Sequence, residues 1–175
     1  MPLDVDATSV RGVWFRHTPA RGKPLFRPEH PDDGRWQRGE IVEGFYLADS
    51  EETAWAEWYR ALAERGVPPM RQIPRDLWRF EVDVSGVADL ATEAQLARVG
   101  LPLPTPDRLE WPRFQAVGEG LFAKGRPGVL YPAAAREGGR ALCLFRTGAR
   151  LRGVKSVRPP VRYTAPPVPP RGLRA

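Results

Sequence analysis

The chain has 175 residues, about one domain, and 42% of them are hydrophobic, which is enough for a globular core. Its single cysteine, Cys143, excludes an internal disulfide, and two histidines are too few for a usual zinc site. No apolar run approaches the ~20 residues of a membrane span, and the opening MPLDVDATSVRG lacks the basic and apolar regions of a signal peptide. We therefore expect a soluble, cytoplasmic protein with no membrane segment and no metal site.

Charge is distributed unevenly along the chain. Residues 1–137 carry 18 basic and 21 acidic side chains, whereas residues 138–175 carry nine basic and no acidic ones, which together give the net charge of +6. From Pro159 onward, repeated prolines predict an extended polyproline segment outside the core. We therefore divide the chain into a domain over 1–158 and a flexible, basic, proline-rich tail over 159–175. This tail is either a solvated segment or a contact for nucleic acid, a membrane surface or an acidic partner.

Apolar patterning predicts the elements of the first half. A strand is expected over 10–16, then a long loop over 17–39 that contains both histidines, then a strand over 44–48. Asp49 and Glu52 have the spacing of a capping box for a helix that ends at Gly66.

The second half contains the clearest strand, 77–84, in which apolar and charged residues alternate strictly. Thr92 and Gln95 form a capping box for a short helix that ends at Gly100. A further helix over 112–125 and strands over 128–131 and 140–145 follow. Strands and helices do not alternate regularly, so the sequence predicts an α+β fold with a mixed β-sheet core and a few helices.

Several standard catalytic motifs are absent from the sequence. It has no P-loop and no G-x-S-x-G nucleophile elbow, and Gly118-Glu119-Gly120 lacks the third glycine of a dinucleotide fingerprint. His17 and His30 both fall in the expected loop, away from any evident nucleophile. A histidine-dependent hydrolase is therefore not expected.

Four polar residues stand out by their positions. Arg16 ends a strand, Arg35 closes the long loop, Tyr46 lies within a strand, and Glu57 lies between two tryptophans on a core-facing helix. Each one alone fits an ordinary role: a surface ion pair for the arginines, a core tyrosine, and a glutamate paired with Arg60 or Arg16. Together, two cations, an aromatic ring and a carboxylate suit a phosphorylated, cationic or aromatic ligand.

Four segments carry a resemblance to a known family. They are VWFRHTPA (13–20), GRW (34–36), GFYLADSEETAWAEW (44–58) and GVLYPAAAREGGRALCLF (128–145). In this order and spacing they resemble the RES-domain family, the toxins of bacterial type II toxin–antitoxin pairs. The resemblance implies a fold like that of ADP-ribosyltransferase toxins. It also implies an enzyme that cleaves the nicotinamide–ribose bond of NAD+ by hydrolysis or phosphorolysis. NAD+ would be a substrate, with phosphate as co-substrate in the second case, and no cofactor is implied.

The resemblance also implies roles for individual residues. Arg16 and Arg35 would hold the pyrophosphate, for which a guanidinium fork is well shaped, and Trp36 would belong to the same NAD+-binding set. Tyr46 would pack near the nicotinamide or its ribose. Glu57, the catalytic residue together with Arg35, would stabilise an oxocarbenium-like transition state and orient the attacking water or phosphate.

The chain departs from the family pattern at two positions. Ala133 stands where the family serine would follow Pro132, and Gln37 stands where asparagine is common. Without the serine hydroxyl, either another group replaces it or activity is lowered or lost. Two alternatives therefore stay open: a RES scaffold with weakened catalysis that binds protein or nucleic acid, and transfer of ADP-ribose to a macromolecule.

The resemblance finally implies a partner, an Xre-type helix-turn-helix antitoxin that covers the active-site cleft. Nucleic acid would then be bound only through the complex. The six tryptophans of the chain are compatible with such a protein interface.

Overall fold

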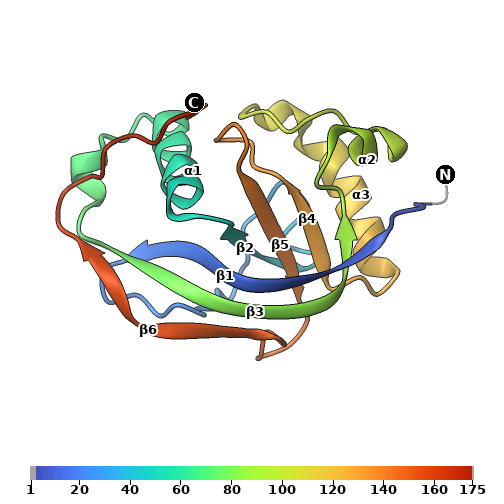
Figure 1. Ribbon diagram of the computed structural model, residues 1–175, viewed down its shortest axis with the longest axis horizontal. Helices are drawn as coiled ribbons and strands as arrows, with labels where there is room; N and C mark the ends of the chain where they lie inside the picture. The colour runs from blue at the N-terminus through green and yellow to red at the C-terminus, as the bar shows by residue number, and fades with distance from the viewer. Residues whose placement is uncertain (1–2, 175) are drawn as a thin grey trace.

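The protein, described here from a computed structural model of residues 3–174, has an α+β fold built on a six-stranded mixed sheet (Figure 1), as predicted. The elements in chain order are β1 (Ala7–Pro19), β2 (Glu43–Ala48), α1 (Glu51–Glu64), the short 3-10 helix η1 (Pro69–Gln72), β3 (Arg75–Asp89), α2 (Glu93–Arg98), the short 3-10 helix η2 (Arg108–Glu110), α3 (Trp111–Ala123), β4 (Gly128–Pro132), β5 (Arg140–Arg146) and β6 (Val154–Tyr163).

The sheet folds back on itself in two groups of three strands. Long β3 lies between β1 and β6, while β5 lies between β2 and β4, all antiparallel. The groups meet where Phe15 pairs with Ala48 and where the end of β3 runs parallel to β4. Apolar side chains of both groups pack together between them, as in the edge-to-face contact of Phe45 with Phe80.

Helices cover the remaining apolar faces. Figure 1 shows α1 on one side of β4 and β5, with α2 and α3 on the other. On α1, Trp55, Trp58 and Leu62 have the i, i+3, i+7 spacing of a buried helical stripe, and they pack against Ala48 and Leu77. The chain thus has three packed clusters, one between the strand groups and one under each helical layer.

Capping of the helices was predicted in part. The capping box of Thr92 with Gln95 is confirmed at α2. At α1 the prediction was wrong: the cap is Ser50, whose hydroxyl accepts a hydrogen bond from the Thr53 amide. Asp49 instead accepts from the Arg140 amide, because this residue continues the pairing of β2 with β5.

Two expected boundaries differ from the structure. Strand β1 extends to Pro19 because it pairs with β3 along its whole length, so His17 lies in a strand and not in a loop. At the other end, our division after residue 158 falls inside β6, which continues to Tyr163. Its two prolines fit because β6 is an edge strand, where a missing amide donor breaks no ladder.

The segment after β6 also packs on the domain. The Tyr59 hydroxyl donates to the carbonyl of Pro167, and the Arg174 amide donates to the carbonyl of Ala135 at 2.7 Å. The chain after residue 163 therefore returns over α1 and over the turn that follows β4.

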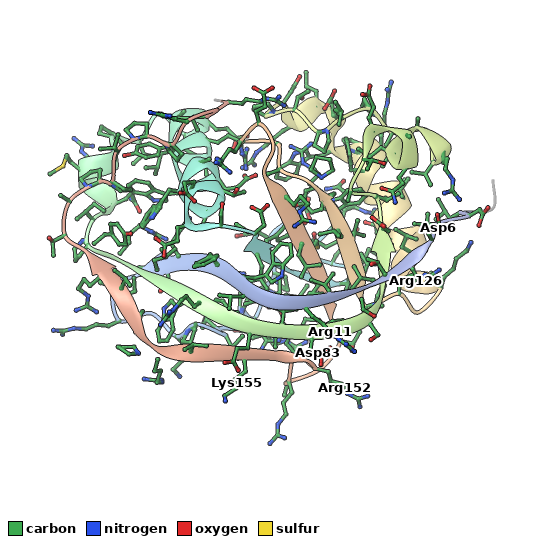
Figure 2. The ribbon with its side chains drawn as sticks, viewed as in Figure 1. Asp6, Arg11, Asp83, Arg126, Arg152 and Lys155 are labelled. Carbon is green, nitrogen blue, oxygen red and sulfur yellow. The ribbon has the colours of Figure 1, made fainter. Side chains whose placement is uncertain are left out.

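Arginines of α2 and of the α3–β4 turn bind the segment that precedes β1. Arg98 pairs with Asp6 at 2.7 Å, and Arg126 donates to the carbonyl of Val5 at 2.9 Å (Asp6 and Arg126 are labelled in Figure 2). Within residues 3–174, no helix is both long enough and apolar enough to cross a membrane.

Candidate active site

A cavity of about 770 Å³, called the first cavity below, opens beside α1 and is large enough for a nucleotide-sized ligand. Its wall comes from α1, the start of α3, the loop after β1, the segment after β4 and residues of the strands β1 to β5. Four of the five predicted site residues line it: Arg16, Arg35, Tyr46 and Glu57. The fold thus brings together the four polar residues that the sequence singled out.

Arg35 is a buried cation with a free hydrogen-bond donor. Only 6% of the residue is exposed, its Nη2 donates to the carbonyl of Thr105, and its guanidinium lies 5.2 Å from the centre of the Phe114 ring. Its Nη1 is buried and has no partner among the described residues. Burial lowers the pKa of Arg35, partly offset by Tyr131 and Glu57. A buried donor without a partner favours an acceptor from outside the chain.

Arg16 is partly buried on β1, and its guanidinium lies over the Phe45 ring at 4.5 Å. Burial lowers its pKa to about 10, with Glu43 opposing and Arg146 adding to the effect, so it is still a cation at neutral pH. Its one protein hydrogen bond within the described residues is long, 3.5 Å from Nη1 to the carbonyl of Tyr46. Most of its donors therefore remain for a ligand.

Tyr46 holds the loop that carries Arg35. Its hydroxyl donates to Gln37 Oε1 at 2.5 Å and accepts from the Trp36 amide at 3.2 Å. Burial raises the pKa of Tyr46 well above its usual value, so the hydroxyl stays protonated. Gly34 is required here because a Cβ at this position would overlap the Tyr46 hydroxyl. Gln37, which departs from the family asparagine, is therefore part of this support and is 1% exposed.

Glu57 faces the cavity from the second turn of α1. Its Oε2 accepts from Arg60 Nε at 3.0 Å, and the Ala135 amide approaches its Oε1 at 3.4 Å. The pairing with Arg60 that we considered as an ordinary structural role is present. Glu57 nevertheless also lines the cavity, so the ion pair fixes the carboxylate at the cavity wall.

Two predicted positions lie outside the cavity wall. Trp36 is fully buried and packs edge to face against Phe114 and Tyr131, so the expectation that it contacts the ligand disagrees with its placement. Its ring lies in the core because α3 packs over the loop that carries it. Ala133, where the family serine would stand, also lies in this core, whereas Ala134 lines the cavity.

Several lining residues were missed by the sequence analysis. Of the described residues, six cationic side chains line the cavity against three carboxylates, so it favours an anionic ligand. The additional cations are Lys23, Arg60, Arg65 and Arg75. Arg60 could have been found from its i, i+3 spacing to Glu57, but no local pattern indicates the others.

His17 is a neutral part of the wall. Its Nδ1 accepts hydrogen bonds from Arg75 at 2.9 and 3.1 Å, and its ring stacks on Trp55. Burial lowers the pKa of His17 well below its usual value, and the positive charges of Arg75 and Arg16 add to this effect. We conclude that His17 remains uncharged near neutral pH and orients Arg75.

The folded-back sheet thus carries a cavity whose described lining residues include more cations than carboxylates. A comparison with protein families matches the RES domain over residues 7–166, so the chain belongs to the RES domain family. Among solved structures it is similar to a chain of the M. tuberculosis MbcT–MbcA toxin–antitoxin complex, with a TM-score of 0.72 and 26% sequence identity. The match covers 90% of this chain and 87% of that chain. Comparison with curated proteins gives no match.

Proposed function

We propose that this chain is the NAD+-degrading toxin of a type II toxin–antitoxin system. Membership of the RES domain family and the similarity to a chain of a toxin–antitoxin complex support the biological class. The observation that carries the chemistry is the meeting of Glu57 with Arg16 and Arg35 in one cavity. A carboxylate together with two cations that could bind a diphosphate is a set of groups suited to cleavage of a dinucleotide at its ribose.

In this proposal the arginines bind the diphosphate of NAD+. Arg35 offers its free Nη1, and Arg16 offers donors that its long bond to Tyr46 leaves open. Because both cations are already held by aromatic rings, little side-chain entropy is lost when the ligand binds.

Glu57 acts at the reacting carbon. The bond from ribose C1′ to the nicotinamide nitrogen breaks, and both of its electrons leave with the ring, which departs as a neutral molecule. The carboxylate of Glu57 stabilises the positive charge that develops on the ribose and orients the acceptor. A water molecule that attacks C1′ loses a proton to solvent and gives ADP-ribose, whereas phosphate gives ADP-ribose with the phosphate group on that carbon.

The test is release of nicotinamide from NAD+ by the purified chain, with and without inorganic phosphate. We expect Glu57→Gln to lower kcat at least ~100-fold, because it removes the charge and keeps the volume. Glu64→Gln is the matched control, since Glu64 also pairs with Arg60 on α1 but does not line the cavity. Equal turnover in wild type and Glu57→Gln would refute the role of Glu57.

A non-catalytic binding role is the second candidate, and Ala133 in place of the family serine is the observation that favours it. A folded wild-type chain that releases no nicotinamide would support this candidate. Labelled ADP-ribose retained on a protein would instead indicate transfer to a macromolecule.

The proposed partner is an Xre-type antitoxin in the cytoplasm, with nucleic acid bound only through that complex. Expression of the chain should lower cellular NAD+ and stop growth, and co-expression of the cognate antitoxin should restore both. Growth arrest without loss of NAD+ would contradict the proposal.

A further inference from the structure

A second cavity, of about 290 Å³, lies between the turn after β1 and the strands β3 and β6. It is separate from the candidate active site, although Gly22, Lys23 and Pro24 border both cavities. Its lining residues are Arg21, Gly22, Lys23, Pro24, Asp76, Trp78, Arg158, Pro160 and Arg162. Four of these nine side chains are cationic and one is acidic.

The acidic side chain is already fully engaged. Asp76 is 1% exposed, and its two oxygens accept from Arg162 at 2.8 and 2.9 Å and from the Arg21 amide at 2.7 Å. Arg162 is therefore neutralised within the chain. By contrast, Arg21, Lys23 and Arg158 form no ion pair with any carboxylate of residues 3–174. Three exposed cations without an ion-pair partner thus border one small cavity, and a bound anion would offset their mutual repulsion.

The turn that carries two of these cations is fixed in an unusual conformation. Arg21 has a φ of 64°, the left-handed region that residues other than glycine seldom adopt. The hydrogen bond from the Arg21 amide to Asp76 holds it there. The backbone amides of Ala20 and Gly22 add hydrogen bonds to the carbonyls of Pro74 and Pro19. Backbone strain of this kind persists where the surroundings enforce it, and it concentrates at binding sites.

Trp78 forms the flat wall of the cavity. Its Nε1 donates to the Thr18 hydroxyl at 3.2 Å, which fixes the ring, and the Arg158 guanidinium lies 5.7 Å from the ring centre. The ring restricts where the Arg158 guanidinium can lie. The fixed ring therefore gives the exposed Arg158 side chain a defined neighbour at the cavity wall.

We propose that the second cavity binds a phosphate or diphosphate group through Arg21, Lys23 and Arg158. Its volume suits such a group better than a whole dinucleotide, which the first cavity is large enough to hold. Planar guanidinium groups match phosphate oxygens, and a lysine adds a point charge. The phosphate belongs either to a free small molecule or to a nucleic-acid backbone; direct binding of the latter would replace the expectation that nucleic acid is bound only through the antitoxin complex. This inference does not depend on NAD+ cleavage.

The experiment is a titration of the full-length chain with inorganic pyrophosphate, followed by the indole N–H signals in a nitrogen–proton spectrum. The Trp78 signal reports on the second cavity, and the signal of Trp111 reports on the first. Because the Trp78 indole donates to Thr18, which lines the first cavity, Arg158→Gln is needed to assign a Trp78 response to the second cavity. We expect the Trp78 signal to shift saturably, and Arg158→Gln to weaken that binding at least tenfold. Arg171→Gln, an exposed cation outside both cavities, should leave it unchanged.

Arg158→Gln should also leave nicotinamide release and the Trp111 response unchanged, which shows that the variant is folded. A Trp78 signal that does not move, or that moves equally in wild type and Arg158→Gln, would overturn the proposal. A wild-type chain that cleaves no NAD+ would leave this proposal standing, because the indole signals and not turnover test it.

A second titration, with a short single-stranded oligonucleotide, distinguishes the two sources of phosphate. Tighter binding than that of pyrophosphate, with a steep decrease in added salt and the same loss in Arg158→Gln, would support the phosphate of a nucleic-acid backbone. Binding no tighter than that of pyrophosphate would support a free phosphate compound.

Discussion

Arg35 is a buried side chain whose surroundings leave one hydrogen-bond donor without a partner among the described residues. The loop held by Tyr46 places it, Thr105 and Phe114 fix its guanidinium, and one nitrogen is left without a partner. A buried cation in this state contributes little to folding and gains most of its interaction energy when an anion arrives.

We predict that Arg35→Ala raises the KM for NAD+ about 30-fold, equivalent to ~2 kcal/mol, with a smaller change in kcat. The variant loses a buried contact to the diphosphate. This contact is equally strong in the ground state and the transition state, so its loss affects KM more than kcat. Steady-state kinetics of nicotinamide release measure it. Arg113→Ala, an exposed cation on α3 outside the cavity, is the control. An unchanged KM with a large loss of kcat would move Arg35 from binding to catalysis.

Asp76 provides the prediction for pH. The hydrogen bonds from Arg162, then that from the Arg21 amide, hold the pKa of its carboxyl below the usual 3.8 despite burial. A carboxyl whose pKa is lower in the folded chain stabilises the fold above its unfolded pKa. That stabilisation is lost as the pH falls from about 3.8 through the lower, folded value.

Asp76→Asn should therefore lower the free energy of unfolding at pH 7 by ~1–3 kcal/mol, and this difference from wild type should shrink below pH 4. Urea unfolding between pH 7 and pH 2.5 measures it. The matched control is Asp83→Asn. Asp83 on β3 forms an ion pair with Arg11 on β1, and both side chains are exposed (Figure 2). That change should alter stability by less than ~1 kcal/mol at any pH. A constant difference for Asp76→Asn across the range would contradict the argument.

Among the elements, α3 fixes the loop that carries Arg35. The Gln115 side chain donates to the carbonyl of Gly34, and Gly118 lies against the carbonyl group of Trp36. The helix can approach the loop this closely only because residue 118 has no side chain.

We predict that Gly118→Ala destabilises the protein by ~1–3 kcal/mol, although alanine favours helices over glycine. The new Cβ would lie 2.8 Å from the carbonyl carbon of Trp36, and backbone atoms cannot give way easily. Gly120→Ala is the control on the same helix, since its Cβ would meet only the end of the Leu3 side chain. Thermal unfolding compares the two variants, and equal melting temperatures would refute this account of α3.

The elements themselves were predictable where one local pattern decided them. Strict alternation gave the centre of β3, and the tryptophan stripe gave α1. Strand β6 was missed because Pro159 and Pro160 argue against a strand unless it lies at a sheet edge, and edge position is not encoded locally. The helix cap at Ser50 was missed because Asp49 is equally suitable by type.

At the scale of the whole molecule, the fold separates two basic regions that the sequence cannot distinguish. One is the first cavity, whose cations come from β1, β3, α1 and two loops. The other includes β6, where the side chains labelled Arg152 and Lys155 point outward at its beginning (Figure 2). The surplus of positive charge in the cavity should attract anionic ligands over a distance set by ionic strength.

We predict that the KM for NAD+ rises several-fold between 50 and 300 mM sodium chloride, because screening weakens the attraction between cavity and diphosphate. Inhibition by nicotinamide, which is uncharged, should change little over the same range and serves as the control. Kinetics at several salt concentrations measure both, and a KM independent of salt would show that the cavity charge does not bind the diphosphate.

The sequence by itself determined the fold class, most elements and the four polar residues Arg16, Arg35, Tyr46 and Glu57, because periodicity, capping and residue type are local properties. Only the tertiary structure decided that these four line one cavity, that Trp36 belongs to the core, and that Lys23, Arg65 and Arg75 add to its charge. It also decided that Arg21 and Arg158 border a second cavity. The physical reason is that such neighbours are brought together by strand pairing and packing between residues far apart in the chain, and local sequence patterns carry no record of those contacts.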